Sequence, residues 1–364
     1  MPRQSSAVKN KLPRTVGIID LHFHGAFGID LMTGSSKDFE ELARALWQKG
    51  IAGFCPTTLS ASESDLTSSV QKIGAWIRKA WNKSGDEKTA SGALPLGIHL
   101  EGPFLSPMAC GAHPKNTIRA FNMQELESLY EASQKTLKLL TIAPELLSPE
   151  QLLSLKNWAK RHEVILSAGH SQATEHQGHT AFENGFSGVT HAWNALAFHH
   201  RSPGILGAAL GRPGTHLEVI IDQVHLAPTL IRWMKRLHAG SKKGRLCFIS
   251  DCVSAAETTT GSHHAFGTLQ VHFADGASRT KGGHLAGGGR LLSDAFHDWI
   301  LIESQSEKIK PKDVLISSLA HLTEHPLQAL QLQGPRWKKF QKTHQVQWVA
   351  TKAGSYLPEP LTSL

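Results

Sequence analysis

The sequence predicts a (β/α)8 barrel, in which eight parallel strands form a closed sheet surrounded by helices. Short aliphatic or β-branched segments alternate with longer segments of helical period from residue 16 to about residue 250. Eight such strand segments can be distinguished, and several of them end in a His, Glu or Asp residue. Strand and helix units that alternate at this spacing favour a closed parallel barrel over an open doubly wound sheet.

The eight expected strands share a high content of aliphatic residues, which is typical of strands that are buried on both faces. They cover residues 16–21, 52–55, 96–100, 137–142, 164–168, 188–190, 217–222 and 246–250. Their distribution predicts one large catalytic domain and not several small ones.

Helices are expected between these strands, at residues 37–49, 62–80, 123–133, 149–161, 174–184 and 227–237. The clearest start lies at Ser148, where Pro149 and Gln151 complete the pattern of an N-cap, a first-position proline and a capping box. After residue 260 we expect the glycine-rich segment GGHLAGGG to be a loop, followed by helices at 292–303 and 311–320.

Composition narrows the class of protein. With 40% hydrophobic and 19% charged residues, the chain can bury a large core. The net charge of +8 is spread along the sequence without aromatic and basic residues interleaved, so we do not expect nucleic acid as a partner. The four cysteines lack metal-type spacing and are expected to be free thiols. The first fifteen residues are basic and polar and lead into no apolar run long enough for a signal peptide or a membrane span, so we expect a cytoplasmic enzyme without a membrane partner.

Three regions are expected along the chain. Residues 1–15 form a basic N-terminal arm, residues 16–330 form the barrel, and residues 331–364 form a C-terminal tail. Within the tail, residues 344–350 have the pattern of one strand.

The first expected strand leads into His22 and His24. In an extended chain, side chains two residues apart point to the same side, so the two imidazoles can bind one metal ion. An HxH pair alone is a weak signal, but its place at the end of an apolar strand strengthens the metal hypothesis, because barrel enzymes build their active sites at that rim.

Four other expected strands end in a residue that can bind a metal or move a proton. These residues are Glu101, His170, His191 and Asp251. Together with the HxH pair they predict a hydrolytic metal site, where a metal acidifies water and polarises a carbonyl group. Asp251 is then the expected general base, which accepts the proton of the water and passes it to the leaving nitrogen.

With these residues identified, the chain resembles the N-acetylglucosamine-6-phosphate deacetylases of the amidohydrolase superfamily over roughly residues 16 to 330. The resemblance lies in GIIDLHFHG, GIHLEGPFLSPMACGAH, LSAGHSQAT, VTHAWNAL, RSPGILGAAL, VIIDQVHL, FISDC and HLAGG. It implies an amidohydrolase-type barrel in which Glu101, His170 and His191 bind one divalent ion and His22 and His24 a second. Zinc is the expected metal, with iron or another divalent ion as alternatives.

The same resemblance implies a set of substrate-binding residues. His113 is placed against the acetyl carbonyl, where it would stabilise the oxyanion. Asn194, Ala195, Arg201 and His225 match positions that hold the sugar phosphate. A loop that lines the sugar pocket is matched by Leu285, Ala286 and Gly287.

The resemblance also leaves points open. Family members commonly carry a small β-sandwich beside the barrel, and only fifteen residues precede the first strand here, so the sandwich is expected to be reduced or missing. The expected reaction is deacetylation of N-acetylglucosamine 6-phosphate by a metal-activated water, in a homodimer. The alternatives are hydrolysis of another N-acyl amino sugar or a cyclic amide, and a barrel that has lost catalysis and only binds.

Overall fold

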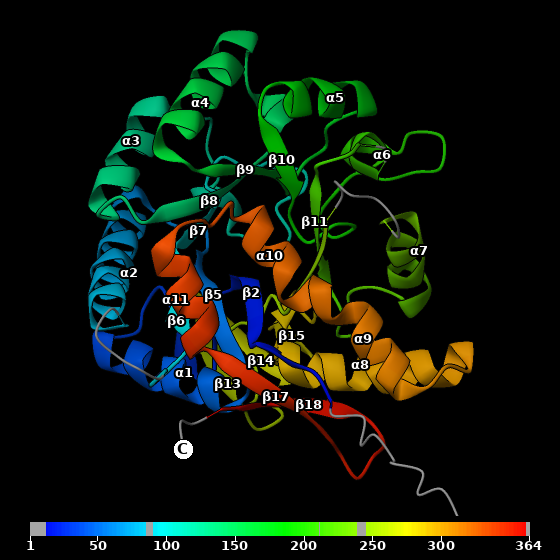
Figure 1. Cartoon of the computed structure of the whole chain (residues 1–364). Coiled ribbons are helices and arrows are strands. Elements are labelled where there is room, and N and C mark those ends of the chain that lie inside the picture. The colour runs from blue at the N-terminus through cyan, green and yellow to red at the C-terminus, as the bar shows by residue number, and fades with distance from the viewer. Residues whose placement is uncertain (1–11, 85–89, 211, 239–244, 362–364) are drawn as a thin grey trace, which may run out of the picture.

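The computed structural model describes residues 12–84, 90–210, 212–238 and 245–361 of the 364-residue chain. Its centre is a nearly closed barrel of eight parallel strands, as predicted (Figure 1). In order around the sheet they are β2 (Ile18–Phe23), β5 (Ile51–Thr58), β7 (Ile98–Glu101), β8 (Leu137–Ile142), β9 (Ile165–Ala168), β10 (Phe186–Val189), β11 (His216–Ile220) and β12 (Arg245–Ile249). Each overlaps an expected strand, although the bounds differ by several residues at β5 and β10.

The seam between β12 and β2 is joined by buried hydrogen bonds. The Asp251 backbone N–H donates to the His22 carbonyl at 3.0 Å. Ser250 donates from its hydroxyl to one Asp20 carboxylate oxygen at 2.5 Å and from its backbone N–H to the other at 3.2 Å. Burial raises the pKa of Asp20 to about 7 despite these bonds. This seam fixes the two strand ends that carry His22 and Asp251.

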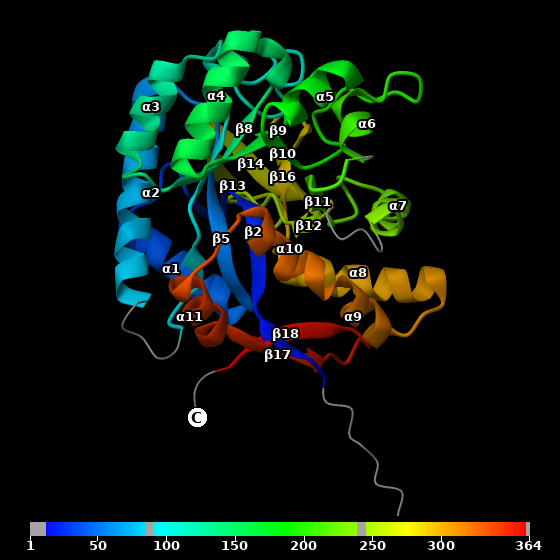
Figure 2. The ribbon, with the colours of Figure 1, turned by 45° about the horizontal axis from the view of Figure 1, so that its top comes forward.

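Helices cover the outside of the barrel (Figures 1 and 2). They are α1 (Ser36–Gln48), α2 (Glu63–Ser84), α3 (Met123–Ala132), α4 (Pro149–His162), α5 (Glu175–Glu183), α6 (Gly204–Leu210), α7 (Pro228–His238), α8 (Leu292–Glu307), α9 (Pro311–Leu322), α10 (Glu324–Ala329) and α11 (Pro335–Thr343). The capping box at Ser148 is present as predicted. The short helices α6, α10 and α11 were not expected. Tertiary packing decides helices of this length more than their own sequence does.

A four-stranded antiparallel sheet lies beside the carboxyl ends of the barrel strands, and it corrects the prediction of a loop at GGHLAGGG. Its strands are β13 (His263–Phe266), β14 (Leu269–Ala274), β15 (Ala277–Thr280) and β16 (Leu285–Gly288). A Cβ atom on Gly288 would lie 2.1 Å from the Ser250 carbonyl oxygen, and one on Gly287 2.7 Å from that of Asp251. Glycine is therefore used here for close approach to the barrel, and not for a flexible loop.

A three-stranded sheet joins the two ends of the described chain at the opposite end of the barrel (Figure 2). It consists of β1 (Arg14–Val16), β17 (Gln345–Ala350) and β18 (Tyr356–Pro360), all antiparallel. The strand expected at residues 344–350 is thereby confirmed. Most of the expected basic arm, residues 1–11, lies outside the described residues.

Minor elements complete the fold. A short ribbon of β3 (Gly25–Ala26) and β4 (Ile29–Asp30) follows β2, and β6 (Leu94–Pro95) pairs with β5. Two 3-10 turns lie at Lys115–Thr117 and Pro144–Leu146.

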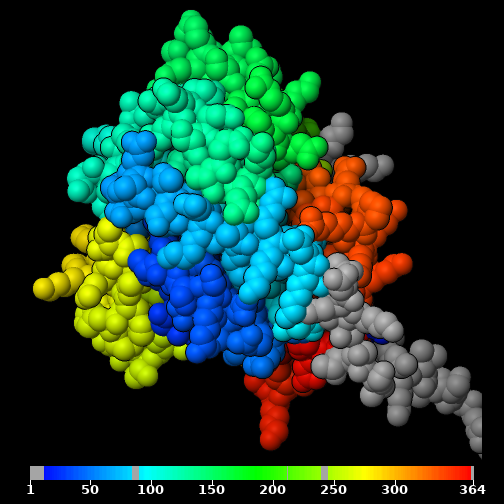
Figure 3. Space-filling view, turned by 90° about the vertical axis from the view of Figure 1, so that its left-hand side faces the viewer, coloured from blue at the N-terminus to red at the C-terminus, as the bar shows by residue number. Residues whose placement is uncertain are grey.

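Figure 3 shows the first helices covering one outer side of the barrel, with the segment of the four-stranded sheet, in yellow, next to them. Among the described residues, no helix combines the length and apolar character that a membrane span requires.

Candidate active site

The six residues predicted to carry the chemistry meet at the carboxyl end of the barrel. They follow or end five different strands, β2, β7, β9, β10 and β12, and all are buried. His170, His191 and Asp251 each have a positive φ, of 48°, 28° and 52°. The chain thus turns sharply where these strands end, in a conformation that non-glycine residues rarely adopt and that clusters at functional sites.

The Glu101 carboxylate is the centre of the cluster. One oxygen, Oε1, lies 3.0 Å from His191 Nε2 and 3.1 Å from His170 Nε2. His22 Nε2 lies 3.5 Å from the same oxygen, and His24 Nε2 lies 3.4 Å from Oε2. One carboxylate therefore touches the histidines of both expected metal sites, as a bridging ligand would.

The direction of the imidazole nitrogens fits a cation between these groups. His170 Nδ1 faces the Ala109 carbonyl at 2.8 Å, and His22 Nδ1 faces the Glu218 carboxylate at 3.2 Å. Both Nδ1 atoms must carry the proton, so in neutral imidazoles each Nε2 presents a lone pair. Those lone pairs point at Glu101 oxygens, which also present lone pairs. A proton or a divalent cation has to lie between them, and histidine with carboxylate is a common ligand set for zinc.

Electrostatics point to the same conclusion. Burial alone would lower the pKa of His22, but the carboxylates of Glu101 and Asp251 raise it well above its usual value. Burial would raise the pKa of Glu101, but the neighbouring histidines, His22 first, hold it well below its usual range. The carboxylate of Glu101 therefore stays ionised. Its negative charge favours a positive charge between it and the imidazole rings.

Glu218 is a functional residue that the sequence analysis missed. It lies on β11, is fully buried, and fixes the orientation of His22 through the 3.2 Å contact with Nδ1. Such outer carboxylates orient metal-binding histidines in many sites. A single Glu within the aliphatic strand LEVI was the available signal, because a buried carboxylate requires a partner.

His99 is a structural histidine and not a ligand. Its Nδ1 donates to the Leu21 carbonyl at 3.0 Å, and its Nε2 accepts the Thr141 hydroxyl at 2.7 Å. The Thr141 hydroxyl also contacts that of Thr190 at 2.6 Å. Both ring nitrogens are occupied, and burial lowers the pKa of His99 well below its usual value, so the ring is neutral.

Asp251 lies against the HxH pair and faces the same space. Its Oδ1 is 3.3 Å from His22 Nε2 and 3.4 Å from His24 Nε2. Burial would raise the pKa of Asp251, but the charge of His22 and the hydrogen bond from His24 lower it. The carboxylate is therefore ionised and available to accept a proton.

His113 presents a hydrogen-bond donor to the same space. Its Nδ1 accepts the backbone N–H of Ser60 at 3.1 Å, so the proton of the neutral ring is on Nε2. That Nε2 lies 3.2 Å from Glu101 Oε2. Burial lowers the pKa of His113 to about 4, which keeps the ring neutral at ordinary pH.

The cluster opens into a cavity of about 160 Å³. Most of the residues expected to bind substrate line this cavity: His113, Asn194, Ala195, His225, Leu285, Ala286 and Gly287. Leu59, Gly111, Ala112 and Phe266 line it as well and were not predicted. Leu285 to Gly287 reach it as strand β16, because this edge of the four-stranded sheet packs on the barrel rim next to Asp251.

Arg201 is not brought to this cavity. It is exposed, and its guanidinium contacts the neighbouring His200 ring at 3.1 Å. His225 does line the cavity, and its Nδ1 is held at 2.7 Å by the carboxylate of Asp222. Within this chain, the phosphate-binding set expected from the sequence is therefore only partly assembled.

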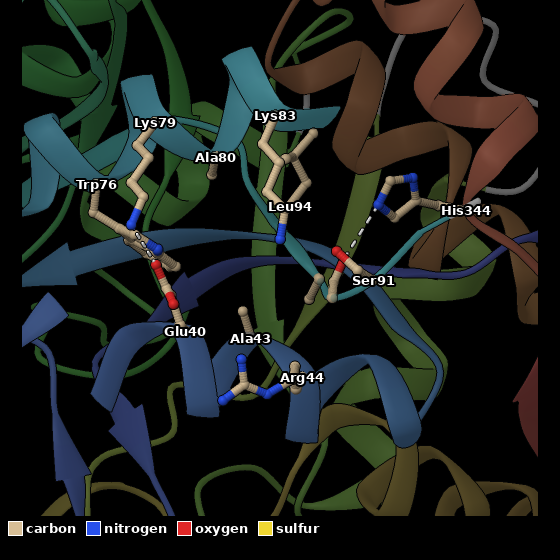
Figure 4. A pocket seen from close by; sticks show the side chains of 12 residues that line it. Glu40, Ala43, Arg44, Trp76, Lys79, Ala80, Lys83, Ser91, Leu94 and His344 are labelled. Atoms are coloured by element: carbon tan, nitrogen blue, oxygen red, sulfur yellow. Dashed lines mark hydrogen bonds and ion pairs between the residues drawn. The ribbon is translucent and has the colours of Figure 1, made fainter. Parts of the chain in front are cut away.

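A second hollow, of about 150 Å³, lies between α1 and α2 and has a different character (Figure 4). The wall formed by Ala43, Trp76 and Leu94 is apolar, and Lys79 pairs with Glu40 across the hollow at 2.7 Å. None of the expected site residues lines it. The chemistry is therefore assigned to the cavity at the barrel rim.

Comparisons with known proteins agree with this geometry. A scan against models of protein families finds no match. The sequence is 33% identical over 270 residues to the N-acetylgalactosamine-6-phosphate deacetylase of Escherichia coli O157:H7, which covers 74% of this chain and 67% of that protein. It is 32% identical over 272 residues to the N-acetylglucosamine-6-phosphate deacetylase of Bacillus subtilis (strain 168), covering 74% of this chain and 65% of that one.

Two solved structures have a fold similar to that of this chain. The N-acetylglucosamine-6-phosphate deacetylase of Thermotoga maritima aligns with a TM-score of 0.72 at 29% identity, over 94% of this chain and 88% of that chain. The corresponding enzyme of Mycobacterium smegmatis aligns with a TM-score of 0.79 at 23% identity, over 94% of this chain and 86% of that one. The second likeness supports the fold alone.

Proposed function

This chain belongs to the N-acetylglucosamine-6-phosphate deacetylase family of metal-dependent amidohydrolases, and on that premise we propose that it removes the acetyl group from N-acetylglucosamine 6-phosphate to give glucosamine 6-phosphate and acetate. The observation that carries the proposal is the Glu101 carboxylate, which lies among five imidazoles at the cavity that Asp251 also lines.

The roles of the residues follow from their positions. A divalent ion, when bound by Glu101 and the histidines, would acidify a water molecule and polarise the amide carbonyl. Asp251, as an ionised carboxylate, would accept the proton of the attacking water and transfer it to the leaving nitrogen. His113 would donate its Nε2 proton to the oxygen on which negative charge develops.

The preference between two epimers is the open part of the substrate assignment. A relative that acts on the galactosamine epimer is about as similar as one that acts on the glucosamine epimer, at 33% and 32% identity. N-Acetylgalactosamine 6-phosphate is therefore the second candidate substrate. The two sugars differ only in the orientation of one hydroxyl group, so residues on the cavity wall decide between them.

An acetate-release assay tests the function. We expect turnover of both 6-phosphates to exceed that of unphosphorylated N-acetylglucosamine by a factor on the order of 100 in kcat/KM, because binding energy from the remote phosphate positions the amide. The control is the same assay after removal of metal with a chelator, which should abolish acetate release. Equal rates with and without the phosphate would favour another N-acyl amino sugar or a cyclic amide, and no acetate from any of them would leave a binding protein.

Metal content tests the two expected sites. We propose up to two divalent ions per chain, with zinc preferred, because two histidine sets share the Glu101 carboxylate. Replacing both His22 and His24 with Gln is expected to lower the metal content by about one equivalent while leaving partial activity. Elemental analysis of the purified protein measures this. A parent protein that never binds more than one equivalent would show that the HxH pair is not a separate site.

Assembly and location complete the proposal. We propose a homodimer, supported by apolar side chains that this chain leaves exposed: Trp233 and Leu237 on α7 are 56% and 62% exposed, and Phe198 is 45% exposed. Phe198 packs on Trp193, which in turn contacts Met234 of α7, so the exposed groups belong to one region.

A cytoplasmic location is supported by four cysteines that are all unpaired.

A further inference from the structure

A hollow of about 630 Å³ lies at the amino ends of the barrel strands, away from the active-site cavity of about 160 Å³. It is lined by the start of β8 at Lys138, the start of β9 at Ile165 and the start of β10 at Ser187. The link between α10 and α11 forms another part of its wall (Figure 1). Barrel enzymes place their chemistry at the carboxyl ends of the strands, so the active site does not account for a hollow at this face.

Three lysines line this hollow: Lys138 on β8, and Lys156 and Lys160 on α4. Glu163 is the only acidic residue of the lining, so three positive charges face one negative charge. None of the three ammonium groups lies within 4.0 Å of a carboxylate of the described residues. Like charges that border one hollow repel each other, so an anion bound there would stabilise all three.

Two of these ammonium groups are held in place and still have donors to offer. Lys138 Nζ donates to the Glu163 carbonyl and Lys156 Nζ to the Glu183 carbonyl, both at 2.9 Å, at the ends of α4 and α5. Each bond uses one of the three N–H donors of an ammonium group, and a helix-end carbonyl carries only a partial charge. Burial lowers the pKa of Lys138, because its neighbours do not offset the loss of water. An anion in the hollow would supply the missing charge.

The wall formed by α11 and the link before it suits an aromatic base. Trp337 lines the hollow, and a T-shaped contact with Trp81, with 4.5 Å between the ring centroids, fixes its indole ring. Gln331 and Gln333 line it as well, and neither side-chain amide bonds to another described residue. Aromatic side chains stack on nucleic acid bases, and an amide offers both a donor and an acceptor to the edge of a base.

We propose that this hollow binds a nucleoside di- or triphosphate, with the phosphates on Lys138, Lys156 and Lys160 and the base against Trp337. One wall is cationic and another is aromatic with free amides, which matches the two halves of a nucleotide. The volume lies within the range of about 300–1,000 Å³ that is usual for small-molecule sites. The inference goes beyond the proposed deacetylation, since it concerns the opposite end of the barrel.

Isothermal titration calorimetry of the metal-loaded protein with ATP in excess Mg²⁺ tests this site. We expect one ATP per chain, which glucosamine 6-phosphate should not displace, because that sugar would bind at the active-site cavity. Lys156→Gln and Lys160→Gln are each expected to weaken ATP binding by a factor on the order of 10, since each removes a charge-assisted contact. The thermal unfolding midpoint of each variant without ATP should stay close to that of the parent, as a check on folding.

Two further variants sharpen the test. Trp337→Leu should weaken ATP binding by a factor on the order of 10 through loss of stacking, and leave binding of inorganic tripolyphosphate unchanged. Lys281→Gln is the matched control, because it removes an exposed lysine after β15, at the other end of the barrel, and should leave ATP binding unchanged.

Three results would overturn the inference: no ATP binding by the parent, displacement of ATP by glucosamine 6-phosphate, or an equal loss of affinity in Lys281→Gln. A fourth is ATP and tripolyphosphate binding equally well both to the parent and to Trp337→Leu. The hollow would then be a site for simple polyanions and not for nucleotides.

Discussion

Asp251→Asn is expected to lower kcat by a factor on the order of a thousand or more while the protein keeps its metal. The amide occupies the same volume and keeps an oxygen beside His22 and His24, whose Nε2 atoms lie 3.3 and 3.4 Å from Oδ1. It cannot take a proton from water or return one to the leaving nitrogen. Single-turnover rates of acetate release, measured beside the metal content of the same sample, separate the two effects.

The control for this variant is Asp275→Asn, which changes the same functional group at an exposed turn and should leave turnover unaffected. Near-normal activity of Asp251→Asn would remove Asp251 from proton transfer. Loss of metal together with activity would make Asp251 chiefly a ligand, which its short distances to the HxH pair also permit.

The barrel and its rim residues were predictable because both leave a local signal. Each strand is a short aliphatic run, and five of the eight lead into a His, Glu or Asp residue, so position along the chain translates directly into position at the rim. His22, Glu101, His170, His191 and Asp251 are all found where that rule places them. The rule works because parallel strands all end at the same side of a barrel.

Other features depend on contacts between distant segments and left little local signal. Two of the four residues of strand β16 are glycines, and the strand is typical of a loop until the Ser250 carbonyl oxygen is known to lie beside Gly288. Arg201 stands in a segment between elements, and neither composition nor period fixes where such a segment points. Glu218 differs from its aliphatic neighbours, but its partner His22 is 196 residues away.

The largest effect on metal binding is expected from Glu101→Gln, which should leave the protein with little bound metal and no measurable turnover. Glu101 is the carboxylate that contacts the histidines of both sets, at 3.0 Å to His191 and 3.4 Å to His24. An amide has only one oxygen to offer and no negative charge, so it can neither bridge two ions nor balance their charge.

Glu218→Gln is the matched control, because it makes the same change at another buried carboxylate of the same barrel. Glu218 contacts the Nδ1 atom of His22, which faces away from Glu101, so its loss should reduce metal affinity by about 10- to 100-fold and leave the ions bound at high metal concentration. Titration of both metal-free variants with zinc distinguishes the two residues. If Glu101→Gln bound zinc as tightly as Glu218→Gln, the carboxylate would not be a bridging ligand, and the histidines alone would hold the metal.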